Sequence, residues 1–105
     1  MPFGVMGGPF QATGHMRIVS NMVDYGMDIQ EAIDGPRCFA DPATGELVLE
    51  PGYDEAVAAE LAEMGHTIKR APIGMGGAQA IQIDFARGIL IGGTDPRKDG
   101  VSLGR

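Results

Sequence analysis

Residues 4–11, with the sequence GVMGGPFQ, join an expected strand to an expected helix through two adjacent glycines. We predict a short strand over residues 3–7, and Pro9 suits the first turn of the following helix because its missing N–H costs nothing there. Glycine lets the backbone approach a ligand without an intervening Cβ, and the start of a helix turns unpaired N–H groups outward. The arrangement suits an oxyanion or a carboxylate, although such a pair is usually only a turn.

Two helices are expected after this turn. The run from Phe10 to Tyr25 is predicted as a helix with one buried face. The residues at helical spacing on that face are Met16, Val19, Met22 and Val23, with Ile18 and Tyr25 beside them. Asp28 followed by Glu31 predicts a capping box for a second helix over residues 29–34, which Gly35-Pro36 ends.

Strands dominate the remainder of the chain. We expect strands over residues 46–50 and 67–71, and between them a helix over residues 55–64 that Asp54 caps. Residues 78–85, with Ile81, Ile83 and Phe85 on one face, are predicted to form a hairpin with residues 89–93. The mixture predicts an α+β fold with early helices and a late antiparallel hairpin, and residues 1–105 are expected to form a single domain.

Composition limits the classes of function. The net charge is −6 without any basic run, which disfavours nucleic acid as a partner, and no apolar stretch approaches the roughly 20 residues that span a bilayer. Residues 1–3 do not resemble a signal peptide, and a periplasmic, secreted or cytoplasmic location stays open. The single Cys38 allows no internal disulfide. Seven methionines are either core filler, which we favour, or surface that is buried elsewhere.

Further motifs accompany the glycine pair in a characteristic order. They are Asp34-Gly35-Pro36-Arg37, Leu49-Glu50-Pro51-Gly52-Tyr53, Gly65-His66, Gly76-Gly77-Ala78-Gln79-Ala80-Ile81 and Gly93-Thr94-Asp95-Pro96-Arg97-Lys98-Asp99-Gly100. In this order and spacing, the set resembles the C-terminal end of the small subunit of γ-glutamyltransferases (γ-glutamyltranspeptidases). The blocks at residues 7–37 and 76–100 carry the resemblance most specifically. Val5-Met6 before the glycine pair is more similar to a bacterial branch of that family.

The resemblance implies a fold and a reaction. The fold is that of N-terminal nucleophile hydrolases, two sheets sandwiched between helix layers, of which this chain would be a C-terminal portion. The family reaction passes the γ-glutamyl group of glutathione or a related amide to a Thr at the start of the small subunit, and then to water or an amine. Only Gly7 and Gly8 match functional positions of the family, as backbone donors of an oxyanion hole. The resemblance implies no cofactor.

No residue of this chain matches the nucleophile. Its four threonines are all internal, namely Thr13, Thr44, Thr67 and Thr94. We therefore expect residues 1–105 alone to be inactive and to need the remainder of the parent enzyme, the large subunit and the N-terminal part of the small subunit, as partners. An isolated fragment is expected to self-associate. The alternatives are a related acylase acting on an amide such as a β-lactam side chain, or a dimerising module without catalysis.

Several further residues have a structural interpretation, and most of them also have a functional one. His15 is expected at the surface or as a cap, or else near the glycine turn, and His66 at a helix C-terminus; two distant histidines do not predict a metal site. Asp95 is expected to cap a turn while Arg97 pairs with a carboxylate, or the loop shapes a substrate cleft. Arg37 follows a helix stop and is a possible subunit contact. Gly76-Gly77 is a tight turn or hinge, or an anion-binding pair.

Overall fold

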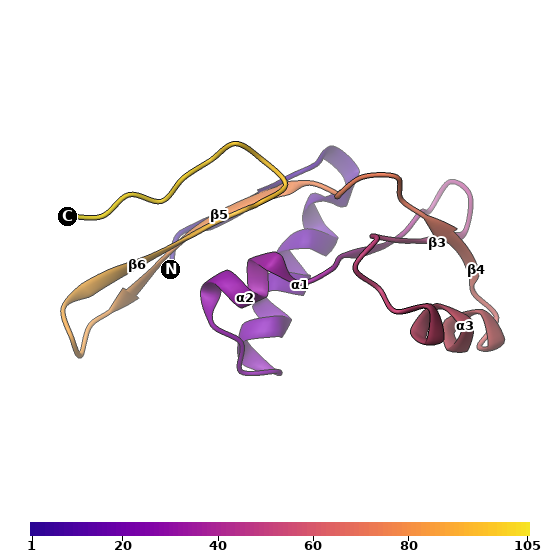
Figure 1. Cartoon of the computed structure of the whole chain (residues 1–105), viewed down its shortest axis with the longest axis horizontal. Helices are drawn as coiled ribbons and strands as arrows, with labels where there is room; N and C mark the ends of the chain where they lie inside the picture. The colour runs from indigo at the N-terminus through magenta and orange to yellow at the C-terminus, as the bar shows by residue number, and fades with distance from the viewer. The chain divides into compact units, whose positions relative to one another are not determined.

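The computed structural model describes the whole chain, residues 1–105, in two compact units. The first unit combines Met1–Gly35 with Gly76–Arg105, and the second is Pro36–Met75. The elements of the first unit are β1 (Phe3–Met6), the single turn of 3-10 helix η1 (Gly8–Phe10), α1 (Gln11–Val23), α2 (Ile29–Asp34), β5 (Gly77–Asp84) and β6 (Ile89–Thr94). Those of the second unit are β2 (Cys38–Ala40), β3 (Glu46–Leu49), α3 (Glu55–Glu63) and β4 (Thr67–Arg70) (Figure 1). The expected α+β class is confirmed.

An antiparallel sheet in the order β1-β5-β6 is the scaffold of the first unit. Met6 pairs with Gly77 in the register of β1 and β5. The predicted hairpin between β5 and β6 is present, and Gly88 lies in its turn with a φ of +66°. Because β1 is paired with β5, the glycine turn that follows Met6 lies beside the beginning of β5.

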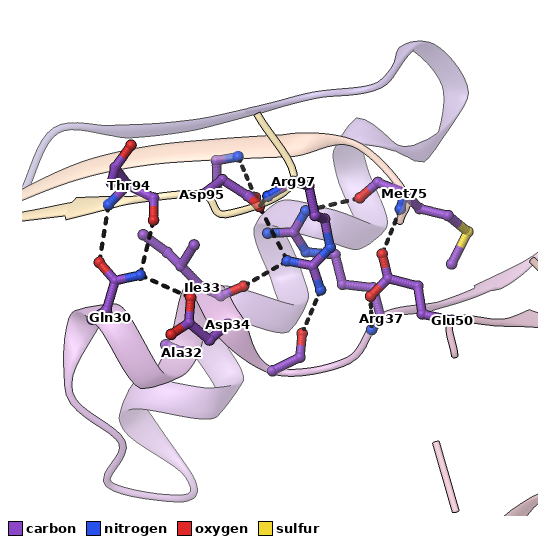
Figure 2. Close-up of polar contacts among 12 residues, drawn as sticks. Gln30, Ala32, Ile33, Asp34, Arg37, Glu50, Met75, Thr94, Asp95 and Arg97 are labelled. Carbon is purple, nitrogen blue, oxygen red and sulfur yellow. Dashed lines mark hydrogen bonds and ion pairs between the residues drawn. The ribbon is translucent and has the colours of Figure 1, made fainter. Parts of the chain in front are cut away.

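Helices α1 and α2 cover one face of this sheet (Figure 1). Gly93 on β6 permits the close approach of α2, because a Cβ there would lie 2.8 Å from Cδ1 of Ile33. Gln30 of α2 binds the edge of β6 at Thr94, accepting its N–H at 3.1 Å and donating to its carbonyl at 2.8 Å (Figure 2). The side-chain amide thus takes the place of a further strand at this position.

On the opposite face of the sheet the C-terminal tail approaches β6, since a Cβ on Gly92 would lie 2.9 Å from Cβ of Ser102, but the large apolar residues stay partly exposed, and we call this side the open face. Ile81 and Ile83 on β5 are 44% and 40% exposed, and Leu90, which pairs with Ile83, is 69% exposed. The alternation predicted for β5 is confirmed, but its large apolar residues lie on this open face. Most methionines are also exposed, namely Met1, Met6, Met16, Met27 and Met64. Core filling is therefore the wrong interpretation for these methionines within this chain.

The buried face predicted for α1 is wrong. Three residues expected on it are exposed, namely Met16, Val19 and Val23. The helix instead buries Gly14, Ile18 and Asn21. A Cβ on Gly14 would lie 2.8 Å from Cγ1 of Val5, so this glycine brings α1 close to β1, while Asn21 donates to the carbonyl of Ala32 at 3.2 Å. An apolar pattern does not reveal this seam, because Gly and Asn contribute no apolar side chain to it.

The predicted helix caps are confirmed. Asp28 accepts the Glu31 N–H at 2.8 Å, and the Glu31 carboxylate accepts the Asp28 N–H at 2.9 Å, which completes the capping box of α2. Asp54 accepts the Ala56 N–H at 3.1 Å at the start of α3. Within α3 only Ala58 is buried, and Val57 is 42% exposed.

The second unit holds a three-stranded sheet in the order β2-β3-β4. Strands β2 and β3 are antiparallel, whereas β3 and β4 are parallel and connected through α3. The sequence pattern predicts β3, α3 and β4 but not β2, because the three residues of β2 are too few to show an alternating pattern. No helix of the chain has the length and apolar character needed to cross a membrane.

Candidate functional site

The glycine pair at residues 7–8 forms the turn between β1 and η1. Gly7 has a φ of +148° and Gly8 a φ of +58°, values that favour glycine. The Gly7 carbonyl accepts the Phe10 N–H at 3.2 Å, whereas neither the Gly7 N–H nor the Gly8 N–H has an acceptor within the chain. The structure thus brings together two adjacent amide donors at the start of a helical turn, as the sequence predicts. Their role as an oxyanion hole stays a prediction.

Phe10 anchors this turn and is 6% exposed. Its ring lies among three glycines, two of them near it in the sequence and the third far along the chain: a Cβ on Gly7, Gly14 or Gly76 would lie 3.2, 2.9 or 3.1 Å from a ring carbon. We call this ring with its three glycines the Phe10 socket. The socket ties the turn to α1 and to the segment before β5. Sequence reasoning placed Phe10 only at the start of a helix, since spacing along one segment cannot reveal such a long-range contact.

The second glycine pair has a different environment. Gly77 is the first residue of β5 and pairs with Met6, while Gly76 has a φ of +72°. A Cβ on Gly76 would lie 2.6 Å from the Met6 carbonyl oxygen, and one on Gly77 would lie 2.6 Å from Cγ of Lys98. Close approach of backbone and side chain therefore explains this pair. The tight-turn interpretation is the one that the geometry supports.

His15 lies near the glycine turn, as one of its two interpretations predicted. Its Nε2 accepts the Val5 N–H at 3.1 Å, and its ring meets that of Phe3 edge to face, with centroids 5.5 Å apart. Because Nε2 is the hydrogen-bond acceptor here, the ring N–H lies on Nδ1. The contact satisfies an outward N–H on β1, which is an edge strand. An open hollow of about 600 Å³ beside it is also lined by Gln79 and Lys98.

Asp95 and Arg97 form a buried ion pair in the first unit (Figure 2). The Asp95 carboxylate accepts the Ala78 N–H at 2.7 Å and the Arg97 N–H at 2.9 Å, and its Oδ1 lies 3.2 Å from Arg97 Nη1. The Arg97 guanidinium donates to the carbonyls of Ile33 and Gly35 at 3.0 Å each. These contacts join β5, the loop after β6 and the end of α2. The predicted turn cap and carboxylate pairing are confirmed.

Arg37 and Glu50 form a corresponding cluster within the second unit. Both are almost wholly buried, at 1% and 2% exposure. The Glu50 carboxylate accepts the Arg37 N–H at 2.7 Å and also the Met75 N–H, and Arg37 Nη1 donates to the Met75 carbonyl at 2.8 Å (Figure 2). The cluster fixes both ends of the segment that makes up this unit. The role of Glu50 was not predicted from the sequence. The one indication of it is that this charged residue follows directly after the apolar strand β3.

Other ionisable groups do not form a metal site, since no three His, Cys, Asp or Glu side chains lie where they could hold an ion together. His66 is exposed, and its backbone N–H bonds to the Leu61 carbonyl at the end of α3. The pKa of Asp84 is lowered from its ordinary value, first because the Arg87 backbone N–H donates to it and second because the Arg87 side chain does. This carboxylate belongs to the β5–β6 turn, far along the strand from the glycine pairs.

Comparisons with known proteins agree on one family. The model of the gamma-glutamyltranspeptidase family matches residues 1–105. The glutathione hydrolase-like YwrD proenzyme of Bacillus subtilis is 36% identical over 97% of this chain and 21% of its own length. Among solved structures, the cephalosporin acylase of Bacillus halodurans superposes with a TM-score of 0.89 at 39% identity, covering 95% of this chain and 19% of that one. A Helicobacter pylori gamma-glutamyltranspeptidase variant gives 0.79 at 34% identity, covering 91% and 53%.

These likenesses confirm the expected fold class, since the neighbours are N-terminal nucleophile hydrolases. The chain spans about a fifth of the length of the curated relative.

Proposed function

The chain belongs to the gamma-glutamyltranspeptidase family, and from this premise we propose that it is the C-terminal segment of an enzyme that transfers or hydrolyses γ-glutamyl groups. The observation that carries the proposal is the pair of adjacent N–H groups on Gly7 and Gly8, which have no acceptor within the chain. Donors of this kind suit an oxygen that becomes negatively charged during acyl transfer. The substrates would be glutathione and related γ-glutamyl amides.

The two amides would act at the tetrahedral stage of the reaction. When a threonine hydroxyl attacks the γ-carbonyl carbon, its proton would pass to the threonine's own amine, the C=O π electrons would move to oxygen and an oxyanion would form. The Gly7 and Gly8 N–H groups would donate to that oxygen until the leaving amine takes up this proton, the C–N bond breaks and the carbonyl returns. Water or an acceptor amine then attacks the acyl-enzyme and passes through a second oxyanion at the same place. The threonine would come from the part of the enzyme outside residues 1–105.

The remainder of the parent enzyme is the proposed partner. The open face of the β1-β5-β6 sheet, with Ile81, Ile83 and Leu90 exposed, is the surface of this chain that would need cover. When residues 1–105 are produced alone, the same face is expected to drive self-association. Sedimentation velocity at high micromolar concentration tests this, and a single monomeric species would contradict it.

A second candidate is an acylase of the same superfamily. It is favoured by the 39% identity and TM-score of 0.89 to the cephalosporin acylase, which exceed the values for the Helicobacter pylori enzyme. The oxyanion chemistry is the same for both, so residues 7–8 do not separate them. Turnover of the full-length enzyme on a γ-glutamyl anilide and on a β-lactam side-chain amide decides which acyl group is the substrate.

The experiment that tests the oxyanion role replaces Gly8 by Val in the full-length, processed enzyme. Val at a φ of +58° forces the backbone to change, so the donor moves. We expect kcat per titrated site to fall roughly 10²- to 10³-fold with KM little changed, because the lost contact acts on charge that is present only in the transition state. Gly88→Val is the matched control, since Gly88 has a φ of +66° and, like Gly8, nothing within 4 Å of an added Cβ. An equal kcat for the two variants would leave residues 7–8 as a turn only.

A further inference from the structure

The peptide between Met6 and Gly7 lies against Gly76. A Cβ built on Gly76 would lie 2.6 Å from the Met6 carbonyl oxygen, a distance that real Cβ atoms do not reach. The nearest atom is backbone oxygen, not the end of a flexible side chain that could move aside. The absence of a side chain at residue 76 is therefore a condition for the present orientation of this peptide.

The same peptide carries the Gly7 N–H. A peptide unit is planar, and in a trans peptide the C=O and N–H point in opposite directions. No peptide bond of the chain is cis. A shift of the Met6 oxygen therefore rotates the whole unit and tilts the Gly7 N–H by a corresponding amount. The contact at Gly76 thus controls the direction of a donor that it does not itself touch.

The Phe10 socket limits how the turn could adjust to such a shift. A Cβ on Gly76 would also lie 3.1 Å from Cδ1 of Phe10, and the same ring carbon lies 3.2 Å from the position of a Cβ on Gly7. The ring is buried, so it cannot turn outward without opening a cavity. Movement of the Met6–Gly7 peptide is consequently not absorbed by the neighbouring side chain.

We propose that Gly76 is a positioning residue for catalysis, because it admits the Met6 carbonyl oxygen and so aims the Gly7 N–H at the developing oxyanion. The inference rests on the proposed function of Gly7 and Gly8. It assigns to Gly76 a role that the sequence around it does not indicate. An oxyanion donor must lie within about 2.7–3.1 Å of the charged oxygen. A tilt that moves the Gly7 N–H by a few tenths of an ångström is therefore sufficient to weaken this hydrogen bond.

The test is Gly76→Ala in the full-length, processed enzyme, compared with Gly45→Ala. Gly45 has a φ of +74° against +72° for Gly76, and an added Cβ on Gly45 meets nothing within 4 Å. Both variants carry the strain of Ala at positive φ, but only Gly76→Ala displaces the Met6 oxygen. We expect kcat per titrated site to fall roughly 10- to 100-fold in Gly76→Ala alone, the scale on which small misplacements act in active sites.

Two further readouts separate positioning from a purely structural effect. Binding of a tetrahedral boronate analogue should weaken in Gly76→Ala, while KM and the affinity for a planar γ-glutamyl ligand stay near those of the unchanged enzyme. Gly76→Asn is the second variant, because Asn tolerates positive φ better than Ala and still carries a Cβ. Turnover is referred to titrated sites, so a low yield of folded enzyme does not alter the comparison.

The outcomes are distinguishable from those of the proposed function. If Gly76→Ala and Gly76→Asn match Gly45→Ala in kcat per site while Gly8→Val still lowers it, the positioning role is overturned and the oxyanion role stands. If Gly8→Val also leaves kcat per site unchanged, the oxyanion role fails and the positioning role fails with it. A loss confined to the Gly76 and Gly8 variants, with boronate affinity reduced in both, supports the inference.

Discussion

Two of the three Gly-Gly pairs of this chain, at residues 7–8 and 76–77, have the same sequence but different surroundings. Neither amide N–H of the first pair has an acceptor in the chain, and a Cβ on Gly8 would meet nothing within 4 Å. In the second pair Gly77 belongs to β5, and a Cβ on either glycine would lie 2.6 Å from a neighbouring atom. The first pair has two N–H groups without an acceptor in the chain. In the second pair, the absence of side chains lets a backbone oxygen and the Lys98 side chain come close.

The difference shows that the role of a Gly-Gly pair depends on the atoms around it and not on its sequence alone. Substitution of Gly8 should act mainly on turnover, because an added Cβ there meets nothing within 4 Å, whereas Gly7 also packs against Phe10. Substitutions near the second pair should act on stability or, at Gly76, on the aim of the Gly7 donor. Changes around the second pair and its strand give three further ways to test this division.

The largest expected effect on stability is that of Asp95→Ala. Asp95 is fully buried, accepts the N–H of Ala78 directly after the second pair, and forms an ion pair with Arg97. Removing the carboxylate takes the Asp95 charge away from Arg97 and takes an acceptor from the backbone N–H groups of Ala78 and Arg97; breaking a buried ion pair in this way typically costs about 3–5 kcal/mol. The urea midpoint of the full-length enzyme should fall accordingly. Asp95→Asn, which keeps one acceptor oxygen, is expected to lose less, and an Ala variant as stable as the unchanged enzyme would contradict the role.

A smaller effect is expected for Gly77→Ala, which sharpens the contrast within the second pair. The added Cβ would lie 2.6 Å from Cγ of Lys98, an exposed and flexible side chain that can move away. We expect a loss of stability below about 1 kcal/mol and an unchanged kcat per titrated site, as for ordinary surface changes. In the background of Lys98→Ala the remaining loss should shrink further. A fall in kcat as large as that of Gly76→Ala would mean that the two glycines act together.

The sequence predicted those parts of the fold that short-range chemistry determines. The capping box of Asp28 and Glu31, the Asp54 cap and the hairpin turn at Gly88 are all local, and each is confirmed. The buried face of α1 was predicted wrongly, because Gly14 and Asn21 lie on it. These residues are buried through their contacts with other elements and not because they are apolar. Local patterns therefore predicted elements more reliably than packing.

The candidate site divides in the same way. The turn at Gly7 and Gly8 was recognisable from the residues around it. The Phe10 socket and the contact between Gly76 and the Met6 oxygen join positions about 70 residues apart, and no spacing rule connects them. The position of Glu50 directly after the apolar β3 hints at a role, but only the folded chain shows that its carboxylate accepts two backbone N–H groups. What the sequence could not supply was long-range contact.

The smallest effect on stability is expected for Asp84→Ala at the far end of β5. Neither of the two glycine pairs lies there, so this change serves as a reference for the changes near them. Asp84 accepts the Arg87 backbone N–H at 2.9 Å and its Nε at 2.6 Å, and both contacts lower the pKa of the carboxyl, the backbone contact more. The pKa of Asp84 is lower in the folded state than in the unfolded state. Asp84 therefore stabilises the fold at pH values above its unfolded-state pKa, and this stabilisation is lost as the pH falls through its folded-state pKa. The difference in melting temperature between the unchanged enzyme and Asp84→Ala should therefore be constant near neutral pH and shrink under acid conditions. Arg87→Ala retains the backbone N–H and should preserve most of this pH dependence. Its complete loss in Arg87→Ala would show that the guanidinium, and not the backbone, holds the charge.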